Sequence, residues 1–157
     1  DNGMPIVVLR AADMGITGYE TPAELDADSA LKAKVESLRL ACGPLMNLGD
    51  VSEKSVPKMT LVAPAQQGGA FMTRSFIPHK CHDTIGVFAA VSAATAALLP
   101  GSPAATVASL PDGMHKTLAV EHPNGATSCV LELDEVGNVA RAGMLRTARK
   151  LFDGTIF

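Results

Sequence analysis

Five consecutive residues, HKCHD starting at His79, carry two imidazoles, an ammonium, a thiol and a carboxylate, and they precede an alanine-rich, almost uncharged run. A helix that begins near Asp83 or Thr84 would direct its unpaired backbone N–H groups, with a partial positive charge, toward this cluster. Lys80 would add a full charge, and His79 and His82 would add hydrogen-bond donors. The combination predicts an anion site whose natural ligand is a carboxylate.

The same residues allow two other interpretations. Asp83 would serve as a helix N-cap that occupies one or two of the free N–H groups, and the local sequence leaves this alternative open. Zinc is the second alternative, because imidazole and thiolate are zinc ligands. However, adjacent residues such as Cys81 and His82 do not easily point at one ion, and His115 and His122 lack paired spacing. We therefore expect no metal, and we assign no function to the two distant histidines.

The run that follows the cluster predicts a central helix. Residues 83–99 have no ionised side chain after Asp83 and are apolar on every side of a helix, so the protein must enclose them. Gly86 lies in what would be the first turn, where it leaves room for a ligand to approach the backbone.

A second, amphipathic helix is predicted to lie on the outside. It begins at a capping box from Thr21 to Glu24, with proline at the first helical position. Apolar residues then recur every three or four positions as far as Leu45, while Glu36 and Arg39 fall on the opposite, polar face.

Apolar and β-branched runs bounded by proline, glycine and asparagine predict six strands. They cover residues 5–10, 59–63, 71–76, 117–121 and 127–133, with a last strand from Val139. We predict an α+β fold in which a curved mixed β-sheet, half-barrel to barrel, wraps around the central apolar helix. The amphipathic helix packs outside the sheet.

Composition limits the possible functions. The chain has 157 residues, enough for a single domain spanning 1–157, and its 13 basic residues are scattered, with a net charge of −3. We therefore expect no nucleic acid and no membrane as partners. Three cysteines without CxxC spacing favour a cytoplasmic location over a disulfide framework. The chain opens with Asp1 and a strand follows at once, so we expect it to begin part-way through a longer protein.

Four separated motifs, DNGMPIVVLRAADMGITGYETPAEL, PHKCH, HPNG and RTARKLFDG, make the chain resemble the second half of a PrpF-family protein. Members of that family are similar in fold to diaminopimelate epimerase, with two pseudo-symmetric halves and an active site between them. The resemblance implies a cofactor-free and metal-free isomerase. Such an enzyme moves a proton and a double bond in an unsaturated di- or tricarboxylic acid, such as oxalomesaconate or methylaconitate.

The resemblance also implies a division of labour between the halves. The family's catalytic lysine and cysteine belong to the first half, which is absent here, so no catalytic residue is assigned in this chain and Cys81 receives no role. The substrate-binding residues implied for this half are Asn2, Gly3, Met4, His79, Lys80, His82, Thr84, Ile85 and Gly86. The asparagine amide and the backbone N–H groups of residues 84–86 would bind carboxylate groups of the substrate.

Three functions remain open at this point. The chain is the substrate-binding half of an isomerase, a non-catalytic binding or accessory module of the same fold, or an unrelated structural domain whose helix end is merely capped. For the first, the expected partners are the small unsaturated di- or tricarboxylate, the protein's own missing first half and a possible homodimer. Exposed apolar surface where the first half would sit also predicts self-association.

Overall fold

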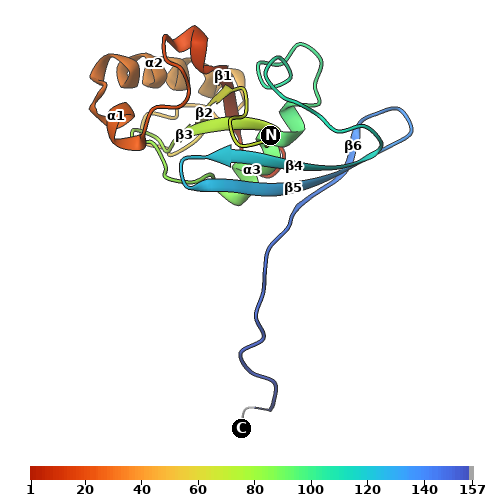
Figure 1. Ribbon diagram of the computed structural model, residues 1–157. Coiled ribbons are helices and arrows are strands. Elements are labelled where there is room, and N and C mark those ends of the chain that lie inside the picture. The colour runs from red at the N-terminus through yellow and green to blue at the C-terminus, as the bar shows by residue number, and fades with distance from the viewer. Residues whose placement is uncertain (156–157) are drawn as a thin grey trace.

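The computed structural model describes residues 1–155 and contains one six-stranded sheet whose strands follow chain order in space (Figure 1). The strands are β1 (Ile6–Arg10), β2 (Lys58–Ala63), β3 (Phe71–Phe76), β4 (His115–His122), β5 (Gly125–Leu133) and β6 (Val139–Met144). β1 pairs with β2 and β3 pairs with β4 in parallel, whereas the other neighbours pair antiparallel. The sheet curls around α3 (Val87–Ala96), which contacts both β1 and β6. The predicted α+β fold, a curved mixed sheet around a central helix, is confirmed.

Each parallel pair of strands requires a crossover connection, and the two crossovers cover opposite faces of the sheet (Figure 1). Between β1 and β2 the chain forms the short 3-10 helix η1 (Ala11–Met14), then α1 (Pro22–Ala27) and α2 (Ser29–Leu45). Between β3 and β4 it forms α3. The sheet is therefore buried on both faces where these helices lie.

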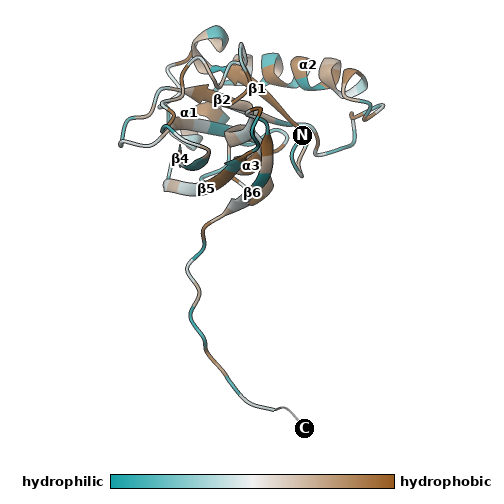
Figure 2. Cartoon of the chain, turned by 90° about the vertical axis from the view of Figure 1, so that its right-hand side faces the viewer, coloured by the Kyte–Doolittle hydropathy of each residue, from teal (hydrophilic) through white to brown (hydrophobic). Residues whose placement is uncertain are grey.

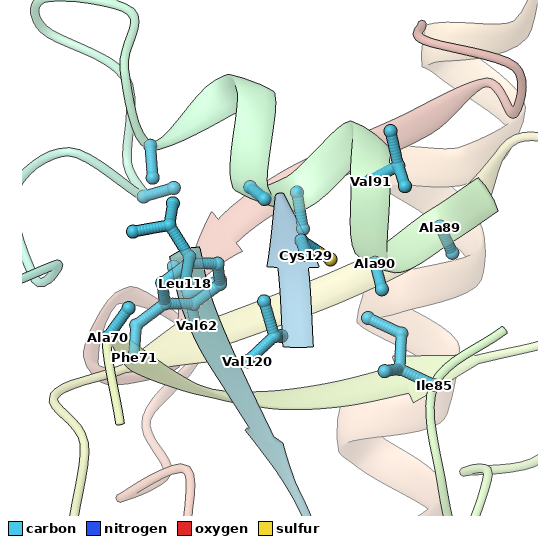
Figure 3. Close-up of a cluster of buried hydrophobic side chains, with 14 of the residues drawn as sticks. Val62, Ala70, Phe71, Ile85, Ala89, Ala90, Val91, Leu118, Val120 and Cys129 are labelled. Carbon is cyan, nitrogen blue, oxygen red and sulfur yellow. The ribbon is translucent and has the colours of Figure 1, made fainter. Parts of the chain in front are cut away.

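The alternation of side chains along β2 and β3 divides the core in two. Val62 and Phe71 pack with α3, whereas Leu61 and Met72 pack with the helices on the other face. Residues 89–94 of α3 are all buried, and their short side chains let the helix lie close to the surrounding strands (Figure 3). Figure 2 shows the hydrophobic colour concentrated on the strands, while α2 carries both colours.

The predicted outer helix consists of two helices. The capping box is present as predicted, since the Thr21 hydroxyl accepts from the Glu24 amide and the Glu24 carboxylate accepts from the Thr21 amide. The chain leaves helical geometry at Asp28, whose side chain accepts a hydrogen bond from the Leu31 amide and caps α2. An N-cap residue is extended, so a single aspartate is enough to end one helix and begin another.

The placement of Arg39 on the solvent-facing side of the outer helix is wrong. Its side chain is fully buried, because the loop after α2 folds over this position. The guanidinium is satisfied there by Glu36, one helical turn earlier, and by carbonyl groups of the loop. Helical periodicity identifies a polar face, but it does not reveal that another segment covers it.

The predicted start of the central helix at Asp83 or Thr84 is also wrong, because α3 begins at Val87. The backbone of the preceding residues is engaged elsewhere: the His82 amide donates to the Ser75 carbonyl, and the Asp83 carbonyl accepts from the amide of Asn124. Asp83 is therefore not the N-cap, which removes the interpretation of a helix end capped by that carboxylate. Within residues 1–155, no helix has the length and apolar character needed to cross a bilayer.

Candidate functional site

An open cavity of about 560 Å³ lies between the turn after β3 and the turn that joins β4 to β5. Its wall consists of Ile77, Lys80, Cys81, His82, Asp83, Thr84 and Asn124. Three residues predicted to bind substrate, Lys80, His82 and Thr84, therefore share one cavity, and all three are exposed. An ammonium and an imidazole beside a hydroxyl can bind a carboxylate group, and the Asp83 carboxylate in the same wall offsets part of the Lys80 charge.

Backbone hydrogen bonds hold the turn that carries these side chains. The Ile77 amide donates to the Lys80 carbonyl over 3.0 Å and closes the turn. The Cys81 amide donates over 2.8 Å to the carboxylate of Asp26, which lies in α1. This bond attaches the cavity wall to α1.

The amino end of α3 lies next along the chain and carries no side-chain cap. The N-cap is Gly86, and the first helical hydrogen bond runs from the Ala90 amide to the Gly86 carbonyl over 2.8 Å. The amides of Val87 to Ala89 have no acceptor within the described part of the chain. These unpaired amides, with the helix dipole behind them, can bind an anion. They lie three residues later than predicted, since Thr84, Ile85 and Gly86 precede the helix.

Lys58, at the start of β2, supplies a cation at this helix end. A methyl group built onto Gly86 would lie 3.9 Å from Lys58 Nζ. Lys58 shares the α3-facing side of β2 with Thr60 and Val62, and within residues 1–155 no carboxylate lies within 4.0 Å of it. The sequence prediction began this strand one residue later and missed Lys58. Lys58 precedes Thr60 and Val62 by two and four residues. Because side chains alternate along a strand, this spacing could have placed Lys58 on the same inward side.

The predicted cleft residues at the amino end of the chain lie along α3. Gly3 adopts φ +91°, and the turn docks on the helix because Ser92 Oγ accepts from the Asn2 amide and donates to the Met4 carbonyl, at 3.0 and 2.9 Å. The Asn2 side chain donates through Nδ2 to Thr95 Oγ1 over 2.8 Å. Its Oδ1 and second N–H are the groups left for a ligand. The turn thus contacts α3 from Phe88, near its amino end, to Thr95.

His79 is separated from the other predicted residues. It does not contribute to the cavity wall, and its Nδ1 lies 3.6 Å from Glu36 Oε2 on α2. The imidazole is more than half exposed, at 59%. His79 therefore links the turn to α2 and is not one of the residues that line the cavity.

Cys81 is buried against the α1 and α2 side of the core. Burial is the main cause that raises the pKa of this thiol to about 11, so the sulfur is a neutral thiol near neutral pH. A neutral, buried thiol is poorly suited to exchange protons with a substrate. Among residues 1–155 no group of three or more His, Cys, Asp or Glu side chains is arranged to hold a metal ion.

Comparison with known proteins gives a family match over the whole chain. The family described as "PrpF protein" matches residues 1–157. The chain is 66% identical over 157 residues to "(4E)-oxalomesaconate Delta-isomerase" of Novosphingobium sp. (strain KA1), covering 100% of this chain and 44% of that protein. It is 54% identical over 156 residues to "4-oxalomesaconate tautomerase" of Pseudomonas putida, covering 99% of this chain and 43% of that protein.

A solved structure shows the same fold. The crystal structure of methylitaconate-delta-isomerase superimposes with a TM-score of 0.84 at 23% sequence identity, over 97% of this chain and 44% of that one. The chain therefore spans less than half the length of these relatives. The curled mixed sheet around a central helix is the diaminopimelate epimerase-like fold expected from the sequence motifs.

Proposed function

Because the chain belongs to the PrpF family, we propose that it is the substrate-binding part of an isomerase of unsaturated di- or tricarboxylic acids, of the oxalomesaconate or methylaconitate type. The observation that carries the proposal is the uncapped amino end of α3, where the amides of Val87 to Ala89 lie next to the ammonium of Lys58, which has no carboxylate partner among residues 1–155. An acid with two or three carboxylates needs more than one anion subsite. The cavity beside Lys80 and His82 supplies the second one.

The proposed mechanism separates binding from proton transfer. A base removes a proton from a carbon next to a carboxylate, the electron pair moves into a new double bond, and an acid returns a proton at another carbon. The negative charge that develops between these steps is stabilised by the donors at the α3 end. The buried thiol of Cys81 is unsuited to either proton transfer. The family resemblance implies a catalytic lysine and cysteine in the first half, so we assign the base and the acid to that half. No cofactor is required.

A binding experiment tests the anion site. cis-Aconitate, an unsaturated tricarboxylate, should raise the melting temperature of the 157-residue chain, because a ligand that binds only the native state stabilises it. The amide NMR signals of Val87, Phe88 and Ala89 should shift first on titration. Succinamide, which has no carboxylate, is the control. Failure of cis-aconitate to shift these signals at millimolar concentration would overturn the proposal.

An accessory binding module is the second candidate, and the neutral state of Cys81 favours it because this chain offers no thiolate at its site. Deuterium exchange separates the two candidates. In deuterated buffer, the intact protein should incorporate solvent deuterium into an oxalomesaconate-type substrate, whereas the isolated chain should incorporate none. An intact protein that binds the acid without exchange is an accessory module. An isolated chain that catalyses exchange contradicts the proposed division of labour.

A further inference from the structure

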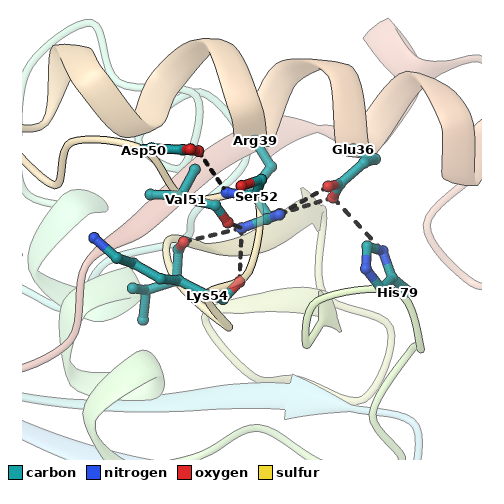
Figure 4. A network of polar contacts seen from close by, with 8 residues as sticks. Glu36, Arg39, Asp50, Val51, Ser52, Lys54 and His79 are labelled. Atoms are coloured by element: carbon teal, nitrogen blue, oxygen red, sulfur yellow. Dashed lines mark hydrogen bonds and ion pairs between the residues drawn. The ribbon is translucent and has the colours of Figure 1, made fainter.

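We propose that Arg39 is a positioning residue for the carboxylate site and that it acts through two segments that flank this site. The inference rests on the proposed function, because it concerns the same pair of anion subsites. Arg39 itself lies in α2, on the opposite face of the sheet from α3, so it acts only through other residues. Figure 4 shows the polar network around its guanidinium.

The first segment is the loop that leads into Lys58. Arg39 Nη1 donates to the backbone carbonyls of Val51, Lys54 and Val56, at 2.8, 2.9 and 3.0 Å, and Figure 4 labels the first two of these residues. The two N–H groups of this nitrogen are thus shared among three carbonyls of a six-residue stretch that contains no regular secondary structure. Lys58 follows Val56 by two residues, so these contacts hold the backbone directly before β2, while the Lys58 amide donates to the Pro5 carbonyl over 3.0 Å.

The second segment is the turn that carries Lys80. Arg39 binds the Glu36 carboxylate through two parallel hydrogen bonds, each 2.7 Å long, from Nε and Nη2. The remaining interaction of that carboxylate is with His79 Nδ1 at 3.6 Å (Figure 4). His79 lies inside the turn that the Ile77–Lys80 hydrogen bond closes. The pKa of Glu36 is held below its usual value chiefly by the hydrogen bonds from Arg39, so this carboxylate stays ionised and available to His79.

A role in positioning explains why a charged residue occupies a fully buried place. Burying an ion pair costs desolvation energy, and an apolar residue of similar size often stabilises a fold equally well. The planar guanidinium offers five donors in a fixed geometry, which an apolar side chain cannot replace. Here those donors fix two irregular segments at once, one before Lys58 and one around Lys80. Misplacing a binding group by about 1 Å can reduce function by up to about a hundredfold.

Three variants of the 157-residue chain separate the two segments. Arg39→Met removes both connections and should weaken cis-aconitate binding about tenfold. Arg39→Lys keeps three N–H donors for the three loop carbonyls but loses the paired bonds to Glu36, so it should restore part of the affinity. His79→Phe alters an exposed residue and removes only the connection to the turn. It should produce a smaller loss of affinity, and because His79 is exposed this variant should fold even if Arg39→Met does not.

The measurement is the dissociation constant of cis-aconitate by titration calorimetry, at a temperature well below the melting point of every variant. Glu121→Gln is the matched control. The buried Glu121 carboxylate also organises a loop, because it accepts hydrogen bonds from the amides of Gln66, Gln67 and Gly69. That loop does not line the site. Glu121→Gln should lower the melting point without changing the affinity for cis-aconitate. Arg39 and His79 variants that melt lower but bind with unchanged affinity overturn the inference and leave the proposed function intact. A wild-type chain that does not bind cis-aconitate overturns the proposed function itself.

Discussion

Two lysines from different segments supply positive charge at the candidate site. Lys58 is half-buried beside the free amides of α3, whereas Lys80 is exposed in the turn after β3. A charge interaction is stronger where less water surrounds the two charges. We therefore expect Lys58 to contribute more to substrate binding than Lys80, although only Lys80 was identified from the sequence.

This difference between the lysines can be measured on the intact protein. Lys58→Ala should raise KM about tenfold or more, and Lys80→Ala should raise KM by a smaller factor, with kcat less affected than KM in both variants. Lys116→Ala, which changes a lysine in β4 outside the cavity wall, is the control and should leave KM unchanged. Equal kinetics for wild type and Lys58→Ala would remove Lys58 from the site.

His122, at the end of β4, is a buried histidine whose Nδ1 has no hydrogen-bond partner among the described residues. Its Nε2 lies 3.4 Å from Thr127 Oγ1. Burial, and secondarily the nearby Arg74 charge, lower the pKa of this imidazole below its usual 6.5. His122 is therefore harder to protonate in the native chain than in the unfolded chain.

This linkage predicts acid sensitivity. As the pH falls from about 7.5 to about 5, the free energy of unfolding should decrease, because the unfolded state binds more protons than the native state below about pH 6.5. His122→Gln should flatten this dependence, measured by urea unfolding at several pH values. Identical slopes for wild type and His122→Gln would contradict this assignment.

At the scale of the elements, α2 and the loop that follows it lie unusually close together at Gly43. A methyl group on Gly43 would come within 2.5 and 2.7 Å of the two Val51 methyl carbons. Glycine in a helix normally weakens it relative to alanine. At this position, however, the absence of a side chain lets the loop reach the depth at which its carbonyls meet Arg39.

Gly43→Ala should therefore destabilise the chain, by about 1–3 kcal/mol, even though alanine is the better helix former. Gly43→Ala should cost less stability when it is added to Val51→Ala than when it is added to the wild-type chain, because Val51→Ala removes the methyl groups that clash. Urea unfolding measures both effects. A more stable Gly43→Ala single variant would show that the loop does not pack against the helix here.

At the scale of the whole molecule, two of the regions with exposed apolar side chains are candidates for contact with a partner. Phe88, at the amino end of α3, is 57% exposed, and its ring lies against the Gly3 turn. The segment after β6 extends away from the body (Figures 1 and 2), with Leu151 and Phe152 exposed at 85% and 67%. Exposed apolar surface of this kind commonly marks an interaction site. We propose that these exposed residues contact the part of the intact protein that corresponds to the remainder of the longer relatives.

The isolated chain should therefore self-associate, and sedimentation velocity should show a larger species as concentration rises. The double variant Leu151→Ser/Phe152→Ser should shift the distribution toward the monomer. Val136→Ser, which removes an exposed apolar residue from the turn between β5 and β6, is the control and should not. A wild-type chain that remains monomeric at all concentrations would indicate that these residues do not form an interface.

The sequence by itself determined the elements and the chemistry of the cluster near His79. Local patterns were sufficient for the six strands, the capping box at Thr21 and the apolar central helix, because alternation and helical periodicity arise from neighbouring residues. The bounds of β3 matched the prediction of residues 71–76. The motifs from DNGMP to RTARKLFDG also indicated the family, which the match over residues 1–157 confirms.

Only the tertiary structure decided where α3 starts, why Arg39 is buried and which lysine lies beside the free amides. Each of these depends on segments far apart in the chain. The turn between β4 and β5 holds Asp83 outside the helix, the loop after α2 covers Arg39, and the register of β2 brings Lys58 to Gly86. Local sequence patterns contain no information about such long-range contacts, because the contacts arise only when the sheet curls around α3.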